Sequence, residues 1–146
     1  MMDRRAFVHR WLGVAAGAGG SLVLTGCASL VVRSVTPVDG RIQLALNRYP
    51  ELAEATGSLR LQADGMREPI YVLTQTDGKY IALSPICTHL GCTVEVERDR
   101  LVCPCHGSTY DRGGAVLKGP AERSLTRFPT QVTADGVLVI ELRASE

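Results

Sequence analysis

The stretch "CTHLGCTVEVERDRLVCPCHGSTYD", residues 87–111, contains four cysteines and two histidines within 25 residues. The whole chain of 146 residues has only five cysteines and three histidines, so nearly all of its soft metal ligands are gathered here. A small domain that concentrates sulfur and imidazole groups in this way is expected to fold around a metal centre.

The spacing within the stretch pairs sulfur with nitrogen. One residue separates Cys87 from His89, two residues separate Cys103 from His106, and thirteen residues lie between the two pairs. A structural zinc finger more often places two cysteines on one knuckle and two histidines on a helix, and zinc takes four ligands where this stretch offers six. The economical interpretation is four ligands and one disulfide, which requires a compartment outside the reducing cytoplasm.

The N-terminal sequence predicts such a compartment. "MMDRRAFVHR" is short and basic, and residues 11–32 follow without one charged side chain, which is the pattern of an export or membrane signal. Residues 3–8, "DRRAFV", resemble the twin-arginine signal, although Asp3 stands where that signal usually has Ser or Thr. That route exports folded proteins, which suits a chain that must receive a metal cofactor in the cytoplasm. We expect residues 1–26 to be the signal.

The fifth cysteine, Cys27, lies far from the other four. Residues 24–27, "LTGC", resemble the lipobox of bacterial lipoproteins, which predicts cleavage before Cys27 and lipidation of its sulfur. Two alternatives stay open: an uncleaved anchor over about residues 11–32, since about 20 apolar residues span a bilayer, or cleavage to a soluble protein. We expect a protein exported by the twin-arginine route and anchored to the membrane on its periplasmic side.

Composition and charge describe one globular domain. The chain is 45% hydrophobic and 21% charged, and its formal net charge is +1. Its basic residues are scattered and form no stripe that could neutralise phosphates, which argues against nucleic acid as a partner. We expect residues 27–39 to be a tether and residues 40–142 to form the domain.

The domain is expected to be all-β. Short alternating or β-branched runs occur at residues 41–46, 58–63, 70–75, 79–84, 93–97, 100–104, 130–134 and 136–142. Asp77-Gly78, Asp99 and Asp135-Gly136 lie between successive runs and suit tight hairpin turns. No pattern predicts a helix longer than two turns, and residues 49–57 suit one helical turn or a loop. The expected fold class is an antiparallel β-sandwich or barrel.

The sequences "CTHLGC" and "CPCHGSTYD" resemble the two cluster-binding loops of Rieske iron–sulfur proteins of the high-potential, cytochrome bc-complex type. The resemblance implies a [2Fe–2S] cluster held by Cys87 and Cys103 on one iron and by His89 and His106 on the other. It also implies a Rieske-type β fold, with a cluster-binding subdomain inserted at about residues 85–122. In this family a disulfide ties the two loops together, and the matching cysteines are Cys92 and Cys105.

Further residues acquire roles from the same resemblance. Ser108 and Tyr110 match hydroxyl donors to cluster sulfur, Leu90 matches an exposed apolar docking residue, and Gly119 and Pro120 match the loop that covers the cluster. With neutral histidines the oxidised cluster has no net charge, whereas an all-cysteine cluster is a dianion. Adding an electron to the neutral centre costs less, which accounts for Rieske potentials of about −150 to +300 mV.

The function that the resemblance implies is one-electron transfer, as the iron–sulfur subunit of a quinol–cytochrome c reductase-like complex. Its expected partners are the membrane, a cytochrome b, a c-type cytochrome and quinol, and no residue is expected to be catalytic in the chain alone. The alternatives are a stand-alone Rieske lipoprotein or the small subunit of an arsenite-oxidase-like molybdenum enzyme. A Rieske ferredoxin for an oxygenase is disfavoured by the disulfide and the export signal, and a zinc-stabilised binding module is the remaining alternative.

Overall fold

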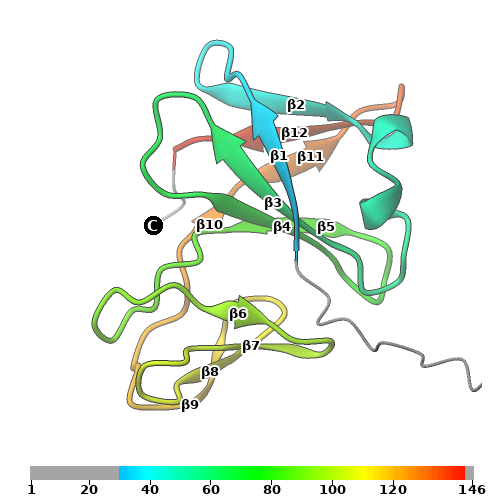
Figure 1. Ribbon diagram of the computed structural model, residues 1–146. Helices are drawn as coiled ribbons and strands as arrows, with labels where there is room; N and C mark the ends of the chain where they lie inside the picture. Colours follow the sequence, from blue (N-terminus) through cyan, green and yellow to red (C-terminus); the bar gives the residue numbers. More distant parts are fainter. Residues whose placement is uncertain (1–29, 144–146) are drawn as a thin grey trace, which may run out of the picture.

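The computed structural model describes residues 30–143, which form three β-sheets (Figure 1). The five-stranded sheet has the order β1 (Val31–Val35), β3 (Ser58–Ala63), β4 (Ile70–Thr74), β5 (Tyr80–Leu83) and β10 (Arg127–Phe128). The three-stranded sheet has the order β11 (Thr130–Val132), β12 (Val137–Glu141) and β2 (Arg41–Ala45). We call these two sheets the base.

The third sheet belongs to the cluster-binding subdomain, which is inserted between β5 and β10 as predicted. It has the order β6 (Glu95–Val96), β7 (Arg100–Val102), β8 (Thr109–Asp111) and β9 (Val116–Lys118), and every neighbouring pair is antiparallel. In Figure 1 this sheet lies apart from the base, below β4 and β5. The predicted all-β class is confirmed: within residues 30–143 the only helices are the short 3-10 turns η1 (Leu46–Arg48) and η2 (Pro50–Leu52).

A first hydrophobic core lies inside the base, where alternating strands turn their apolar sides toward one another. The pattern "SLRLQA" in β3 buries every second residue, and β2 and β12 bury theirs against it. The first core consists of Ile42, Leu44, Leu52, Leu59, Leu61, Ala63, Ile70, Val72, Ala82, Leu138 and Ile140. These side chains are at most 2% exposed, so the base has a dry interior of its own.

A second core joins the base to the cluster-binding subdomain. It consists of Tyr71, Leu73, Leu83, Cys87, Val94, Leu101, Cys103, Tyr110, Ala121 and Leu125. Strand β4 serves both cores, because Ile70 and Val72 point into the first and Tyr71 and Leu73 into the second. This two-sided burial explains why β4 is buried throughout and shows no alternation of apolar and polar residues.

The predicted hairpins are present. Strands β4 and β5 pair across the Asp77-Gly78 turn, and β11 and β12 pair across Asp135-Gly136. Gly78 and Gly136 have φ of 79° and 74°, in the left-handed region that glycine adopts without strain. Strands β6 and β7 flank Asp99 as expected.

The prediction of a tether over residues 27–39 is wrong where β1 lies. Residues 31–35 pair in parallel with β3 from Val31 opposite Leu59 to Val35 opposite Ala63. β1 shows no alternation because it is an exposed edge strand on both faces, so periodicity could not reveal it. The Nη2 atom of Arg33 lies 2.6 Å from Glu51 Oε1, which links this strand to η2. An anchor extending to residue 32 would overlap the strand.

The signal over residues 1–26 and the lipidation site at Cys27 lie outside the described residues. Within residues 30–143, no helix has the length and apolar character needed to cross a bilayer.

Candidate metal centre

Two loops of similar geometry present the four expected ligands. In the first, the Gly91 N–H donates to the Cys87 carbonyl at 2.9 Å, and in the second the Gly107 N–H donates to the Cys103 carbonyl at 3.0 Å. Both glycines have positive φ, 80° and 74°, with open space where a Cβ would lie. They are therefore required by backbone conformation rather than by close packing.

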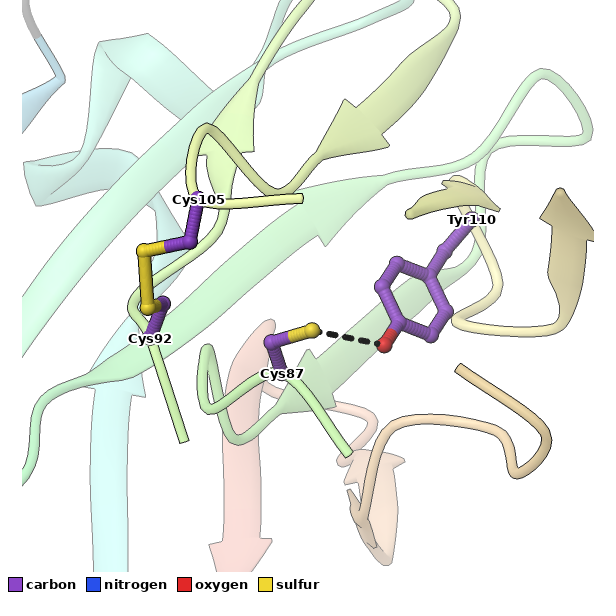
Figure 2. Close-up of a disulfide and its surroundings, with 4 residues drawn as sticks. All are labelled: Cys87, Cys92, Cys105 and Tyr110. Atoms are coloured by element: carbon purple, nitrogen blue, oxygen red, sulfur yellow. Dashed lines mark hydrogen bonds between the residues drawn. A yellow bond between two sulfur atoms is a disulfide. The ribbon is translucent and has the colours of Figure 1, made fainter. Parts of the chain in front are cut away.

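A disulfide joins the two loops, as predicted. The sulfurs of Cys92 and Cys105 are bonded, and their Cα atoms lie 6.5 Å apart (Figure 2). The cross-link closes a short segment of chain, so the two loops are held together even when no metal is bound.

The two remaining described cysteines, Cys87 and Cys103, are free thiols that are 2% and 1% exposed. The sulfur of Cys103 lies within 4.8 Å of the sulfurs of Cys92 and Cys105. These three sulfurs do not form a ligand set, because the disulfide sulfurs are not thiolates. Cys87 and Cys103 are the sulfur ligands that the site can offer.

The two free thiols differ in acidity. Burial acts against ionisation of Cys87, but hydrogen bonds from Tyr110 and from the His89 backbone outweigh it and lower the pKa of the Cys87 thiol. Burial, together with the adjacent Cys87, raises the pKa of the Cys103 thiol. The environment of Cys87 is thus arranged to stabilise negative charge on sulfur.

Tyr110 supplies much of that stabilisation. Its hydroxyl oxygen lies 3.2 Å from Cys87 Sγ (Figure 2), 3.2 Å from the Thr88 N–H and 3.2 Å from Thr88 Oγ1. Thr88 Oγ1 donates its own proton to the Arg123 carbonyl at 2.6 Å. The Tyr110 proton therefore points to Cys87 Sγ or to Thr88 Oγ1. Burial raises the pKa of Tyr110, which keeps the hydroxyl a donor.

Ser108 links the second loop to the Gly119-Pro120 loop. It is fully buried, and its Oγ accepts a hydrogen bond from the Ala121 N–H at 3.0 Å. The hydroxyl proton remains available, and the Ser108 hydroxyl is among the groups that lower the pKa of Cys87. Ser108 can therefore hold the covering loop and donate to sulfur at once.

The histidines form the outer side of the site. The rings of His89 and His106 meet edge to face with their centroids 4.9 Å apart. Nδ1 of His89 is buried without a hydrogen-bond partner, which costs free energy unless a ligand occupies it. His106 is exposed, and Leu90 beside His89 is 70% exposed. The site is closed on the cysteine side and open on the histidine side.

A family model for the Rieske [2Fe-2S] domain matches residues 48–129, more than half of the chain. The chain belongs to the Rieske family. It is 40% identical over 87 residues to cytochrome b6-f complex iron-sulfur subunit 1, cyanelle, of Cyanophora paradoxa, covering 56% of this chain and 36% of that protein. It is 42% identical over 85 residues to the cytochrome b6-f complex iron-sulfur subunit of Synechococcus elongatus, covering 55% and 47%. The Rieske chain thus spans about half or less of these relatives.

A solved structure shares the fold. The quaternary ammonium Rieske monooxygenase CntA in complex with L-carnitine aligns with a TM-score of 0.56 and 18% identity, covering 64% of this chain and 30% of that one. At this identity the likeness concerns the fold alone.

The residues of the site fit a [2Fe–2S] cluster, which the Rieske domain binds. Two buried free thiols and two imidazoles in edge-to-face contact, one with an unpartnered buried Nδ1, offer the sulfur and nitrogen donor types that such a cluster requires. Sequence reasoning missed Thr88 and Arg123, because the bond between them ends on a backbone carbonyl, and a carbonyl is present at every residue.

Proposed function

We propose that this chain transfers single electrons through a [2Fe–2S] cluster, as the iron–sulfur subunit of a quinol–cytochrome c reductase-like complex. Cys87 and Cys103 would hold one iron, and His89 and His106 would hold the other. The observation that carries the proposal is the polarity of the site, with two buried thiols on one side and the half-buried His89 and exposed His106 rings on the other. When bound, the cluster accepts and releases one electron per cycle.

The chain's own residues supply binding, tuning and access. Tyr110 and Ser108 donate toward sulfur and so favour the reduced state, which raises the potential. The histidine side, with exposed Leu90 beside it, is where a quinol or a cytochrome docks. An outer imidazole nitrogen there that has released its N–H proton would accept the proton that leaves a quinol hydroxyl. Gly119 and Pro120 cover the remaining side, held through the Ala121 N–H.

The similarity to cytochrome b6-f iron-sulfur subunits supports this complex over the alternatives. The test is to isolate the full chain from solubilised membranes. Reduction by dithionite is expected to give a rhombic EPR signal with an average g below 2. A cytochrome b, identified by its haem absorption spectrum, is expected to co-purify with the chain. Full iron loading without that signal contradicts the cluster assignment. A molybdenum enzyme in place of cytochrome b supports the alternative complex.

We also propose export by the twin-arginine route and anchoring through a lipid on Cys27. The support is the sequence "LTGC" at residues 24–27, together with the start of β1 only four residues after Cys27. Intact-mass measurement of membrane-extracted protein is expected to show a chain that starts at Cys27 with added acyl mass. Retention of Arg4 and Arg5 supports the uncleaved anchor, and an unmodified cleaved chain contradicts both anchors.

A further inference from the structure

Arg112 is a buried cation that the cluster site does not use. It follows β8 directly, is only 7% exposed, and makes no ion pair among the residues that the structure describes. Burial lowers the pKa of its guanidinium, yet no carboxylate compensates. Since an unpaired buried charge is costly, its other contacts must offset that cost.

The contacts of Arg112 are backbone carbonyls from both parts of the molecule. In the base, Nη2 donates to Gly57 at 2.9 Å, Thr56 at 3.2 Å and Thr74 at 3.3 Å. In the cluster-binding subdomain, Nη1 donates to the β6–β7 turn, at 3.1 Å to Arg98 and 3.4 Å to Glu97. One planar guanidinium therefore joins the adjoining ends of β3 and β4, which pair with each other in the base, to the β6–β7 turn, which pairs with neither of them.

The surroundings of Arg112 are tightly built. The Arg112 carbonyl accepts a hydrogen bond from Gln75 Nε2 at 3.2 Å, so the residue is tied to the end of β4 by its backbone as well. A Cβ added at Gly57 would lie 2.2 Å from the Glu51 carbonyl oxygen, which shows how closely the chain packs beside this contact. Three carbonyls of the base surround Nη2, whereas the buried Nε has no hydrogen-bond partner.

We propose that Arg112 is a positioning residue that fixes the cluster-binding subdomain on the base and thereby holds Tyr110 against Cys87. Tyr110 lies in β8 and Arg112 follows this strand directly, and β7, which pairs with β8, leads out of the turn that the guanidinium contacts. The guanidinium thus restrains both strands that place the Tyr110 hydroxyl 3.2 Å from Cys87 Sγ. The part concerning Tyr110 rests on the proposed electron-transfer function.

Three variants of the detergent-solubilised, cluster-loaded full chain test the proposal. Arg112→Met keeps the length of the side chain without its donors, and Arg112→Lys keeps the charge without the planar fork. Arg33→Met is the control, because Arg33 is an exposed arginine of the base with a single partner, Glu51. Amide hydrogen exchange, the midpoint potential and the EPR line shape are measured for each.

In Arg112→Met, exchange in β6, β7 and β8 is expected to rise by about tenfold or more, the effect of losing one hydrogen bond to a charged group, while β2 and β12 are unchanged. The potential is expected to fall and the EPR lines to broaden, because the distance from Tyr110 to Cys87 becomes variable. Arg112→Lys is expected to show exchange rates and a potential between those of Arg112→Met and the parent protein. If Arg112→Met does not fold, Arg112→Lys by itself tests the proposal. Arg33→Met is expected to match the parent protein.

The proposal is overturned if exchange rises equally in all strands with the potential unchanged, or if Arg112→Lys matches the parent protein. The exchange measurement does not depend on the proposed function. If the parent protein lacks the expected EPR signal, the proposed function fails while the comparison of exchange in β8 and β12 still decides the role of Arg112.

Discussion

Two buried tyrosines of the second core show how a single contact decides a role. The Tyr110 hydroxyl lies 3.2 Å from Cys87 Sγ, whereas the Tyr71 hydroxyl donates to the Val94 carbonyl at 2.9 Å. Burial raises the pKa of both hydroxyls, so both remain protonated donors at neutral pH. Of these two tyrosines, only Tyr110 can influence the charge on the Cys87 sulfur.

We predict that Tyr110→Phe lowers the midpoint potential by about 60 mV and retains the cluster. A hydrogen bond to a charged sulfur contributes about 1.5 kcal/mol, which changes a one-electron equilibrium about tenfold. Redox titration followed by EPR measures the shift. Tyr71→Phe is the matched control, since it removes a buried hydroxyl from the same core without touching sulfur; an equal shift in both variants would contradict the assigned role.

At the scale of elements, the turn between β8 and β9 ties the cluster-binding subdomain to the base. Gly114 has φ of 86°, its carbonyl accepts from the Leu125 N–H at 2.8 Å, and a Cβ there would lie 3.1 Å from Leu83 Cδ2. Gly136, in the β11–β12 turn, has φ of 74° but open space around it. Both turns need a residue with left-handed backbone conformation. Only at Gly114 do neighbouring side chains also leave too little room for a Cβ.

We predict that Gly114→Ala destabilises the protein by more than Gly136→Ala. The control variant bears only the left-handed strain, about 1–2 kcal/mol. Gly114→Ala adds overlap with Leu83, a side chain of the packed second core, where overpacking costs about 1–3 kcal/mol more. Thermal unfolding of the cluster-loaded proteins measures the melting temperature of each variant. Equal melting temperatures would show that a Cβ at residue 114 does not clash with Leu83 of the base.

Sequence patterning predicted the longer strands with at least one buried face and missed β1, which is exposed on both faces. The alternation in β2, β3 and β12 was visible because one face is buried and the other is not. β1 is exposed on both faces, and its parallel partner β3 begins more than twenty residues later. No alternating run was recognised at β8 or β9, which have three residues each.

At the scale of the whole molecule, two cores share one sheet. The first core draws only on the base, whereas Cys87 and Cys103 are themselves members of the second core. Their ionisation state and ligation therefore affect the packing of the cluster-binding subdomain directly. The first core has no ligand residue and stands apart from the metal centre.

We predict that removing the iron loosens the cluster-binding subdomain and leaves the base folded. Metal-binding free energy contributes to the folding of the part that supplies the ligands, and the second core loses that contribution. Amide exchange in β7 and β8 is expected to approach that of exposed turns after chelation, while β2, β3 and β12 stay protected. Uniform loss of protection would show that the two cores unfold as one unit.

The sequence by itself determined the chemistry of this protein: the donor types and their spacing, the loop glycines, the hairpin turns and the strands with one buried face. These features depend on residues that are close together in the chain, so the types and spacing of their side chains are enough to predict them. Only the tertiary structure decided that Thr88 reaches the carbonyl of Arg123, that Arg112 joins the base to the β6–β7 turn, and that β1 pairs with β3. These contacts end on backbone groups of distant segments. Since every residue has a backbone carbonyl, residue types cannot predict which carbonyl is contacted.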